Sequence, residues 1–362
     1  MQKLLACIGF IFCALTLYLT SSNAGMKWIT QDRYSRIGAL GADKYLYGDL
    51  YGLTYLSKFK NVKDTNFVSL PAKDQKVNSD TANLFILGDS YLYSFFKEDP
   101  RYYANISQVK FIRWDVANPI EIIPARNQKN ILLIESVERN MSGLFNLNSV
   151  KARLDRAEAV QSEPNARQKI AHFFAEIDEG IKESLYHKYL EANIEFAWFN
   201  FGFLEPLKEL KADFNLNFFG RVDKEVAISK DQNFLYLAET LNPNNPGSSF
   251  SDISEAKLKA QVSELNRIQE YYKARGFDEV ILSIIPNPVS VLKTENRPDN
   301  HLIQRIKSHP DFKGKLIDAT EDLSKNANSN FFTSDSHWNQ KGAKIWLDQL
   351  NRQLQNVTYL GN

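Results

Sequence analysis

The stretch Leu84-Phe85-Ile86-Leu87-Gly88-Asp89-Ser90 decides the fold. Four consecutive apolar residues predict a buried strand, and the Gly-Asp pair that follows predicts a turn. Residues 91–96 then have the aromatic and aliphatic spacing of a helix start. Ser90 is therefore expected where a strand passes into a helix, at the carboxyl end of the strand. In open α/β sheets this edge is where ligands bind.

Similar units follow along the chain. Ser254 is expected to cap a helix that runs to about Arg275 and ends at Gly276, and residues 339–354 are expected to form a closing helix. Further buried strands are predicted at residues 109–116, 131–136, 279–285 and 316–318. Strands that alternate with helices indicate an α/β fold with a parallel sheet flanked by helices.

The middle of the chain has a different pattern. Residues 151–191 are charged and repeat apolar residues every three or four positions, which predicts an amphipathic helix on the core, with a lid or partner helix as the alternative. Short aromatic stretches at 196–203, 214–219 and 234–237 predict a small strand-containing insertion at about 194–245. Residues 242–251, with two prolines and a glycine, are the best candidate for a linker.

The first 24 residues form a targeting segment. Lys3 precedes an uncharged apolar run over residues 4–19, and small polar residues follow it. This is an export signal. Ser22 and Ala24 favour cleavage before Gly25, while the length of the run also permits a retained signal anchor. The expected location is the bacterial cell envelope, periplasmic or secreted, with tethering to the inner membrane if the segment is uncleaved.

Composition excludes several classes of protein. The two cysteines, Cys7 and Cys13, both lie in the targeting segment, so the exported part has no disulfide, as is natural in a bacterial envelope. A balance of 44 Lys+Arg against 43 Asp+Glu gives no field that would attract nucleic acid. The other histidines lack ligand spacing and no phosphate loop is present, so neither a metal nor a cofactor is expected.

A serine, a histidine and an aspartate are placed for nucleophilic catalysis. A serine hydroxyl attacks at neutral pH only if an imidazole accepts its proton, and that imidazole needs a carboxylate to orient it. Asp335 and His337 lie two residues apart in a polar loop before the last helix. They predict a triad in which Ser90 is the nucleophile, His337 the general base and Asp335 its partner. The Ser90 amide and the amides that follow are expected to stabilise an oxyanion.

Several segments carry a resemblance to a known family. GDSY at 88–91 and the late Asp-x-His resemble blocks one and five of the SGNH, or GDSL, hydrolase superfamily. DSHWNQKGA at 335–343 is similar to the Asp-x-His-Trp-x-x-x-Gly signature of its alginate O-acetyltransferase group. IIPNPVSV at 284–291 and LLIESVERN at 132–140 resemble two further segments of that group. The resemblance covers residues 83–354.

The resemblance implies a flavodoxin-like SGNH catalytic domain over residues 25–354 and a short tail over 355–362. It implies the same roles for Ser90, His337 and Asp335, a polysaccharide as acyl acceptor, and a membrane-embedded acyl-transfer partner on the donor side. The order of the motifs is permuted relative to the alginate group, and Pro288 stands where the group commonly has lysine. The block-two glycine and the Gly-x-Asn-Asp block, which supply oxyanion donors, are not recognisable.

Four residues near the predicted site have two interpretations each. Arg139 would contact an acyl oxygen or a sugar with Glu135 holding it, or the two would form a local ion pair. Trp338 would stack on a sugar ring or pack its own loop. Asn287, between two prolines, would donate to the oxyanion or make a turn.

Three functions follow from these patterns. The leading hypothesis is an O-acetyltransferase that modifies an envelope or extracellular polysaccharide through an acyl-serine. An esterase that deacylates such glycans uses the same intermediate and resolves it with water. A glycan-binding assembly protein that retains the fold without turnover is the hypothesis from another class.

Overall fold

The computed structural model describes residues 2–22, 46–50, 52–64, 81–96, 98–116, 119–155, 190–199 and 202–359. The chain divides into two compact units. The helical unit comprises Met1–Ser57 and Glu158–Arg221, and the sheet unit comprises Lys58–Ala157 and Val222–Asn362.

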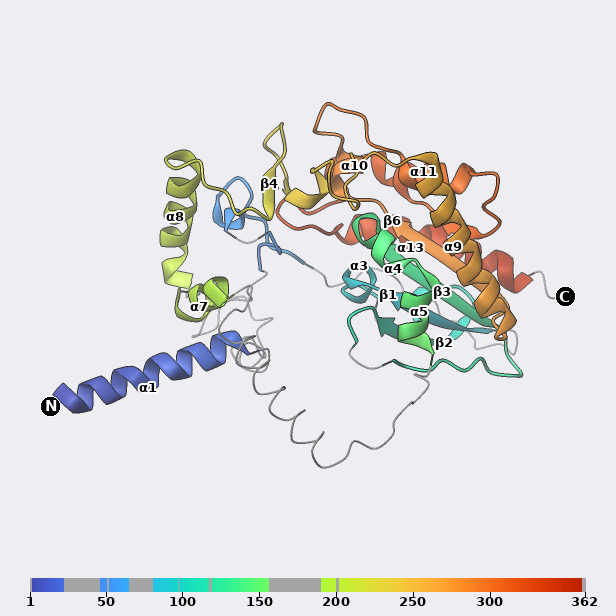
Figure 1. Ribbon diagram of the computed structural model, residues 1–362, viewed down its shortest axis with the longest axis horizontal. Helices are drawn as coiled ribbons and strands as arrows, with labels where there is room; N and C mark the ends of the chain where they lie inside the picture. The colour runs from blue at the N-terminus through green and yellow to red at the C-terminus, as the bar shows by residue number, and fades with distance from the viewer. Residues whose placement is uncertain are drawn as a thin grey trace. The chain divides into compact units, whose positions relative to one another are not determined.

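The sheet unit is built on five parallel strands in the order β2-β1-β3-β6-β7 (Figure 1). These are β1 (Ala82–Gly88), β2 (Ile106–Arg113), β3 (Asn130–Val137), β6 (Glu279–Ile285) and β7 (Lys315–Ile317). The order reverses direction between β1 and β3, as in flavodoxin-like sheets. The α/β class and the flanked parallel sheet predicted from the sequence are therefore confirmed.

Helices cover both faces of this sheet because its central strands are apolar on both sides. On one face, α3 (Ser90–Tyr93), α10 (Pro288–Leu292), α12 (Thr320–Ser324) and α13 (Gln340–Tyr359) enclose one core with inward side chains such as Ile86 and Leu133. On the other face, α4 (Met141–Leu144), α5 (Leu147–Leu154), α9 (Glu255–Ala274) and α11 (Leu302–Ser308) pack on residues such as Leu132 and Leu282.

Most predicted boundaries in the sheet unit are close to the observed ones. The Ser254 side chain caps α9 by accepting from the Lys257 amide, and Gly276 ends the helix with a φ of 98°. β2 begins and ends three residues before the predicted 109–116 strand. The closing helix α13 continues to Tyr359, so most of the tail predicted at 355–362 is helical.

The insertion predicted at 194–245 differs from expectation. Its aromatic stretches at 196–203 and 214–219 fall mainly in α7 (Leu190–Phe199), the short helix η4 (Gly202–Leu204) and α8 (Glu205–Asn217). In α8 the apolar residues Leu207, Leu210 and Phe214 recur at three- and four-residue intervals, which favours a helix. The third stretch is correct: β5 (Leu235–Leu237) pairs antiparallel with β4 (Val226–Ile228). The predicted linker at 242–251 instead packs inward with Ser248 and Ser249 buried.

The helical unit contains α7, α8, the N-terminal helix α1 (Gln2–Ser21) and the short helix η1 (Leu53–Tyr55). Among the described residues α1 alone is long and apolar enough to cross a membrane, which suits a signal sequence or an anchor. Most of the helix predicted over 151–191 lies outside the described residues. Four more short helices complete the described elements: η2 (Pro100–Tyr102), η3 (Glu138–Asn140), η5 (Ala238–Thr240) and η6 (Ala327–Ser329).

Candidate active site

Ser90, His337 and Asp335 are in hydrogen-bond contact although 247 residues separate the serine from the histidine. Ser90 Oγ lies 2.7 Å from His337 Nε2, and His337 Nδ1 lies 2.6 Å from Asp335 Oδ1. The same carboxylate oxygen accepts the His337 backbone N–H at 3.0 Å, which fixes its position relative to the ring. Ser90 is partly exposed, whereas Asp335 is 2% exposed and His337 8%. The arrangement has the contacts of a nucleophile, base and orienting acid.

The turn after β1 holds the serine at the edge of the sheet. Asp89 is the N-cap of α3: its Oδ1 accepts from the Tyr91 amide at 2.8 Å, and its Oδ2 accepts from Val137 N at 3.0 Å. The second bond ties the turn to the end of the neighbouring strand β3. Gly88 leaves no room for a side chain, since a Cβ there would lie 2.9 Å from Glu135 Oε2. The glycine is required by this close approach.

Tyr91 links the serine turn to the histidine loop. Its ring centroid lies 4.6 Å from that of His337, and its hydroxyl donates to the Ser336 carbonyl. Trp338 is fully buried, and its Nε1 donates to the Tyr91 carbonyl at 3.2 Å. The sugar-stacking role considered for Trp338 is therefore not available to its enclosed ring, and the indole packs the loop in place.

Lys63 is a member of the site that sequence reasoning missed. Its Nζ lies 2.7 Å from Asp335 Oδ2, and the two side chains are 15% and 0% exposed. The same ammonium sits 5.8 Å from the centre of the Phe332 ring. Both oxygens of the Asp335 carboxylate are thus engaged, Oδ1 by His337 and Oδ2 by Lys63. No motif marks this lysine, which is 272 residues away from its partner.

Glu135 lies beneath the serine turn, and its carboxylate bonds to that turn. It is fully buried, its Oε2 accepts the Asp89 N–H at 3.0 Å, and its Oε1 has no hydrogen bond within the described part of the chain. Burial, reinforced by the nearby Asp89 charge, raises the pKa of Glu135 well above its usual value. The Arg139 charge opposes this rise, and the hydrogen bond of the Glu135 carboxylate to the Asp89 N–H supports the serine turn.

Arg139 reaches toward the serine turn from the end of β3. Its guanidinium lies 5.7 Å from the Tyr91 ring centre, with one nitrogen 3.5 Å from the Tyr91 hydroxyl. On the other side its Nε is 3.9 Å from the half-exposed Glu239 carboxylate. Arg139 therefore contacts the residue next to Ser90, in keeping with its predicted place near the site.

Two expected oxyanion donors are occupied elsewhere. The Tyr91 amide bonds to Asp89. Asn287 is fully buried, and its side-chain nitrogen donates to the Gly247 carbonyl at 3.1 Å and to Ser249 Oγ at 3.0 Å. The Ser90 amide is not among these occupied groups and stays a predicted donor.

A second buried carboxylate lies at the same edge of the sheet. Glu138 Oε2 accepts from the Asn287 amide at 2.9 Å, from Ser290 Oγ at 3.1 Å and from Ser249 Oγ at 3.5 Å. Burial outweighs these donors and raises the pKa of Glu138 to about 7. The group joins the end of β3 to the residues that follow β6.

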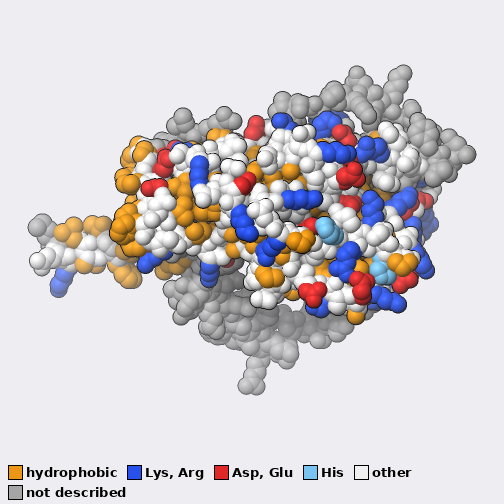
Figure 2. Space-filling view, turned by 90° about the horizontal axis from the view of Figure 1, so that it is seen from above, with side chains coloured by type: hydrophobic (Ala, Val, Ile, Leu, Met, Phe, Trp, Pro, Cys, Tyr) orange, Lys and Arg blue, Asp and Glu red, His pale blue; other side chains and the backbone are white. Residues whose placement is uncertain are grey.

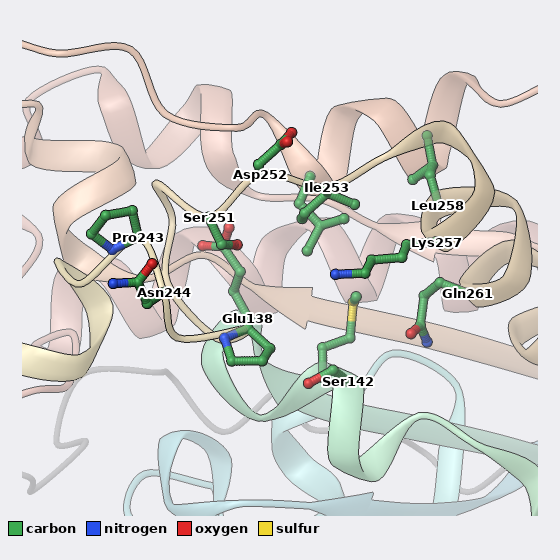
Figure 3. A pocket seen from close by; sticks show the side chains of 13 residues that line it. Glu138, Ser142, Pro243, Asn244, Ser251, Asp252, Ile253, Lys257, Leu258 and Gln261 are labelled. Carbon is green, nitrogen blue, oxygen red and sulfur yellow. The ribbon is translucent and has the colours of Figure 1, made fainter.

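Glu138 also borders a cavity of about 160 Å³. Figure 3 shows the Lys257 ammonium pointing into this space from α9, toward the side on which Glu138 lies. Its apolar walls include Met141, Leu258 and Leu302, which belong to the core on the face opposite the one that contains Tyr91 and Trp338. This cavity is therefore not the pocket in which a group on Ser90 would lie.

No family model, curated protein or solved structure matches the chain.

Proposed function

We propose that this protein is an exported serine acyl-transfer enzyme, an O-acetyltransferase that modifies a cell-envelope or extracellular polysaccharide through an acyl-Ser90 intermediate. The observation that carries the proposal is the continuous contact from Ser90 Oγ through His337 to Asp335, with distances of 2.7 and 2.6 Å. Hydrogen-bonded serine, imidazole and carboxylate in this order are one established arrangement that activates a hydroxyl at neutral pH.

In the first half-reaction Ser90 Oγ attacks the carbonyl carbon of an acyl donor while His337 Nε2 takes the hydroxyl proton. Asp335 holds the Nδ1–H and stabilises the imidazolium. The carbonyl oxygen becomes an oxyanion, for which the Ser90 amide is the proposed donor. When the tetrahedral intermediate collapses, His337 returns the proton to the leaving group, and the acyl group stays on Ser90.

In the second half-reaction a sugar hydroxyl attacks the acyl-serine, and His337 removes its proton. The new ester leaves with the sugar, and the proton returns to Ser90 Oγ. The sequence similarity to the alginate O-acetyltransferase signature around His337 and the N-terminal apolar helix support a sugar acceptor and an envelope location. A membrane-embedded protein that delivers the acyl group is the proposed donor-side partner.

An esterase is the second candidate, favoured by the partial exposure of Ser90, which gives water a route to the intermediate. The test is incubation of the purified full chain in detergent with a chromogenic acetyl ester, with and without an acetyl-free oligosaccharide. Acetylated sugar that forms only in the presence of the acceptor selects the transferase, and acetate release alone selects the esterase.

Intact mass spectrometry supplies the control. The wild-type chain is expected to gain one acetyl group and the Ser90→Ala variant none, with activity reduced on the order of a thousandfold or more. Absence of both turnover and an acyl-enzyme, in a folded chain, would leave the non-catalytic glycan-binding hypothesis.

A further inference from the structure

Helix α8 in the helical unit exposes its apolar side. Leu207, Leu210, Phe214 and Phe218 recur at three- and four-residue intervals, which places them along one stripe of the helix and its C-terminal end. They are 60%, 63%, 49% and 70% exposed, respectively. We refer to these four residues as the apolar stripe. Figure 2 shows hydrophobic side chains gathered on this part of the surface, beside the protruding α1.

The opposite side of α8 is polar and faces the protein. Lys208 is 5% exposed, with its Nζ 3.1 Å from the Tyr55 hydroxyl. Glu205 accepts from the Tyr47 hydroxyl at 2.6 Å, and Glu209 from the Ser57 amide at 3.2 Å. A surface helix in water has the reverse arrangement, with its apolar side inward. The polarity of α8 therefore fits an environment less polar than water.

Helix α7 connects this arrangement to α1. Asn193 Nδ2 donates to the Thr20 carbonyl at 2.8 Å, and the Trp198 ring lies 4.7 Å from that of Phe12. Residue numbers fall along α1 as they rise along α7, so α7 runs antiparallel to the C-terminal half of α1. The Glu195–Lys211 ion pair at 2.8 Å then joins α7 to α8.

The depth of this packing follows from helix geometry. Phe12 precedes the end of α1 at Ser21 by nine residues, or about 14 Å along the axis. Half the hydrocarbon thickness of a bilayer is about 15 Å. With α1 spanning a membrane, α7 enters the leaflet in which α1 ends, and its exposed Trp198 and Phe199 reach into the acyl chains.

We propose that α1 is retained in the mature protein and that α7 and α8 form with it a membrane-embedded anchor whose apolar stripe contacts lipid. We infer that lipid covers the apolar stripe, because the stripe belongs to the same packed unit as α1, the helix that could span the membrane. The inference is independent of the chemistry at Ser90, since every residue involved lies in the helical unit.

The test uses the full chain with Cys7 and Cys13 replaced by alanine, reconstituted into phosphatidylcholine vesicles. Single cysteines at Leu210→Cys and Phe218→Cys carry an environment-sensitive fluorophore, and quenching by lipids brominated in their acyl chains is measured. Ile8→Cys on α1, 55% exposed, serves as the lipid control, and Lys259→Cys on α9, whose side chain is 73% exposed, as the aqueous control.

Quenching at 210 and 218 within about twofold of that at position 8, with little at 259, is the expected result. The proposal is overturned if brominated lipid does not quench the fluorescence of the labels at positions 210 and 218. Crosslinking between two copies at position 218 would then show that a second copy of the chain covers the apolar stripe. Intact mass of protein extracted from membranes gives an independent measurement: loss of residues 1–24 would overturn the retention of α1.

Discussion

The ammonium nitrogen of Lys63 lies 2.7 Å from Oδ2 of Asp335, the carboxylate oxygen on the opposite side from His337. The carboxylate that orients the base is thus itself oriented by a cation. Because Asp335 is buried, removing the lysine would leave its charge without this partner.

Lys63→Met is expected to lower kcat by about tenfold with a smaller effect on KM, since the carboxylate loses a bond that fixes its orientation. Its unfolding free energy should fall by on the order of 3 kcal/mol, as for other buried pairs that lose one member. Ester turnover and urea denaturation measure the two effects. Lys58→Met is the matched control, because Lys58 is exposed on the same segment and contacts Gln232 and the Phe59 ring, not Asp335. Equal behaviour of the two variants would contradict a role for Lys63.

Gly88→Ala is expected to destabilise the sheet unit by about 1–3 kcal/mol and to reduce turnover. A Cβ at this position would meet Glu135 Oε2 at 2.9 Å and Phe111 at 3.1 Å. Gly143→Ala in α4 is the control, because nothing lies within 4 Å of the added Cβ there. Thermal melts followed by circular dichroism compare the variants, and an unchanged melting temperature for Gly88→Ala would count against the tight packing under Ser90.

Trp338→Phe distinguishes packing from sugar binding. The variant loses the Nε1–H bond to the Tyr91 carbonyl, so we expect about 1–3 kcal/mol less stability and a lower kcat. KM for an oligosaccharide acceptor should remain unchanged. A raised KM at unaltered stability would instead place the indole against the sugar.

Glu138 makes stability depend on pH. Its carboxyl group ionises near 4.5 when unfolded and at about 7 when folded, so between these values the native state holds a proton that the unfolded state has lost. Stability therefore falls as pH rises from 4.5 toward 7, by about 3 kcal/mol in total from this group.

Glu138→Gln should flatten the curve of unfolding free energy against pH over that interval, because the amide cannot ionise and still offers an oxygen to the Asn287 amide. Urea denaturation at half-unit pH steps measures the effect. A slope identical to that of the wild-type chain would show that another group carries the dependence.

The sequence predicted the central strands well because they are buried on both faces and read as continuous apolar runs. It placed β2 three residues late because this strand lies at the edge of the sheet. Ser107 and Gln108 at its start are polar, so the predicted strand began only at Val109.

The helices of the 194–245 region were mistaken for strands for a different reason. Aromatic residues are common in strands, and the interpretation assumed that they would be buried. Among the described residues Phe203 and Phe218 have some of the most exposed hydrophobic side chains, at 78% and 70%. A sequence pattern does not state which solvent surrounds the apolar side of a helix.

The contact between Ser90, His337 and Asp335 could be predicted because the three residue types suit one another chemically and the Asp-x-His pair is local in sequence. Lys63 and Glu138 could not be, since each acquires its role from partners that only the fold brings close. Their contacts join residues 272 and 149 positions apart, respectively. Glu135 was predicted to lie near the site. The direction of its side chain could not be predicted, because it depends on which face of β3 is turned toward Ser90.

The strand order has a consequence for the time at which activity arises. Ser90 follows β1, the first strand of the sheet along the chain, whereas Asp335 and His337 follow β7, the last. A chain whose synthesis or export stops before residue 335 carries the serine without its base. The proposed acyl transfer therefore requires the sheet to have formed up to its last strand.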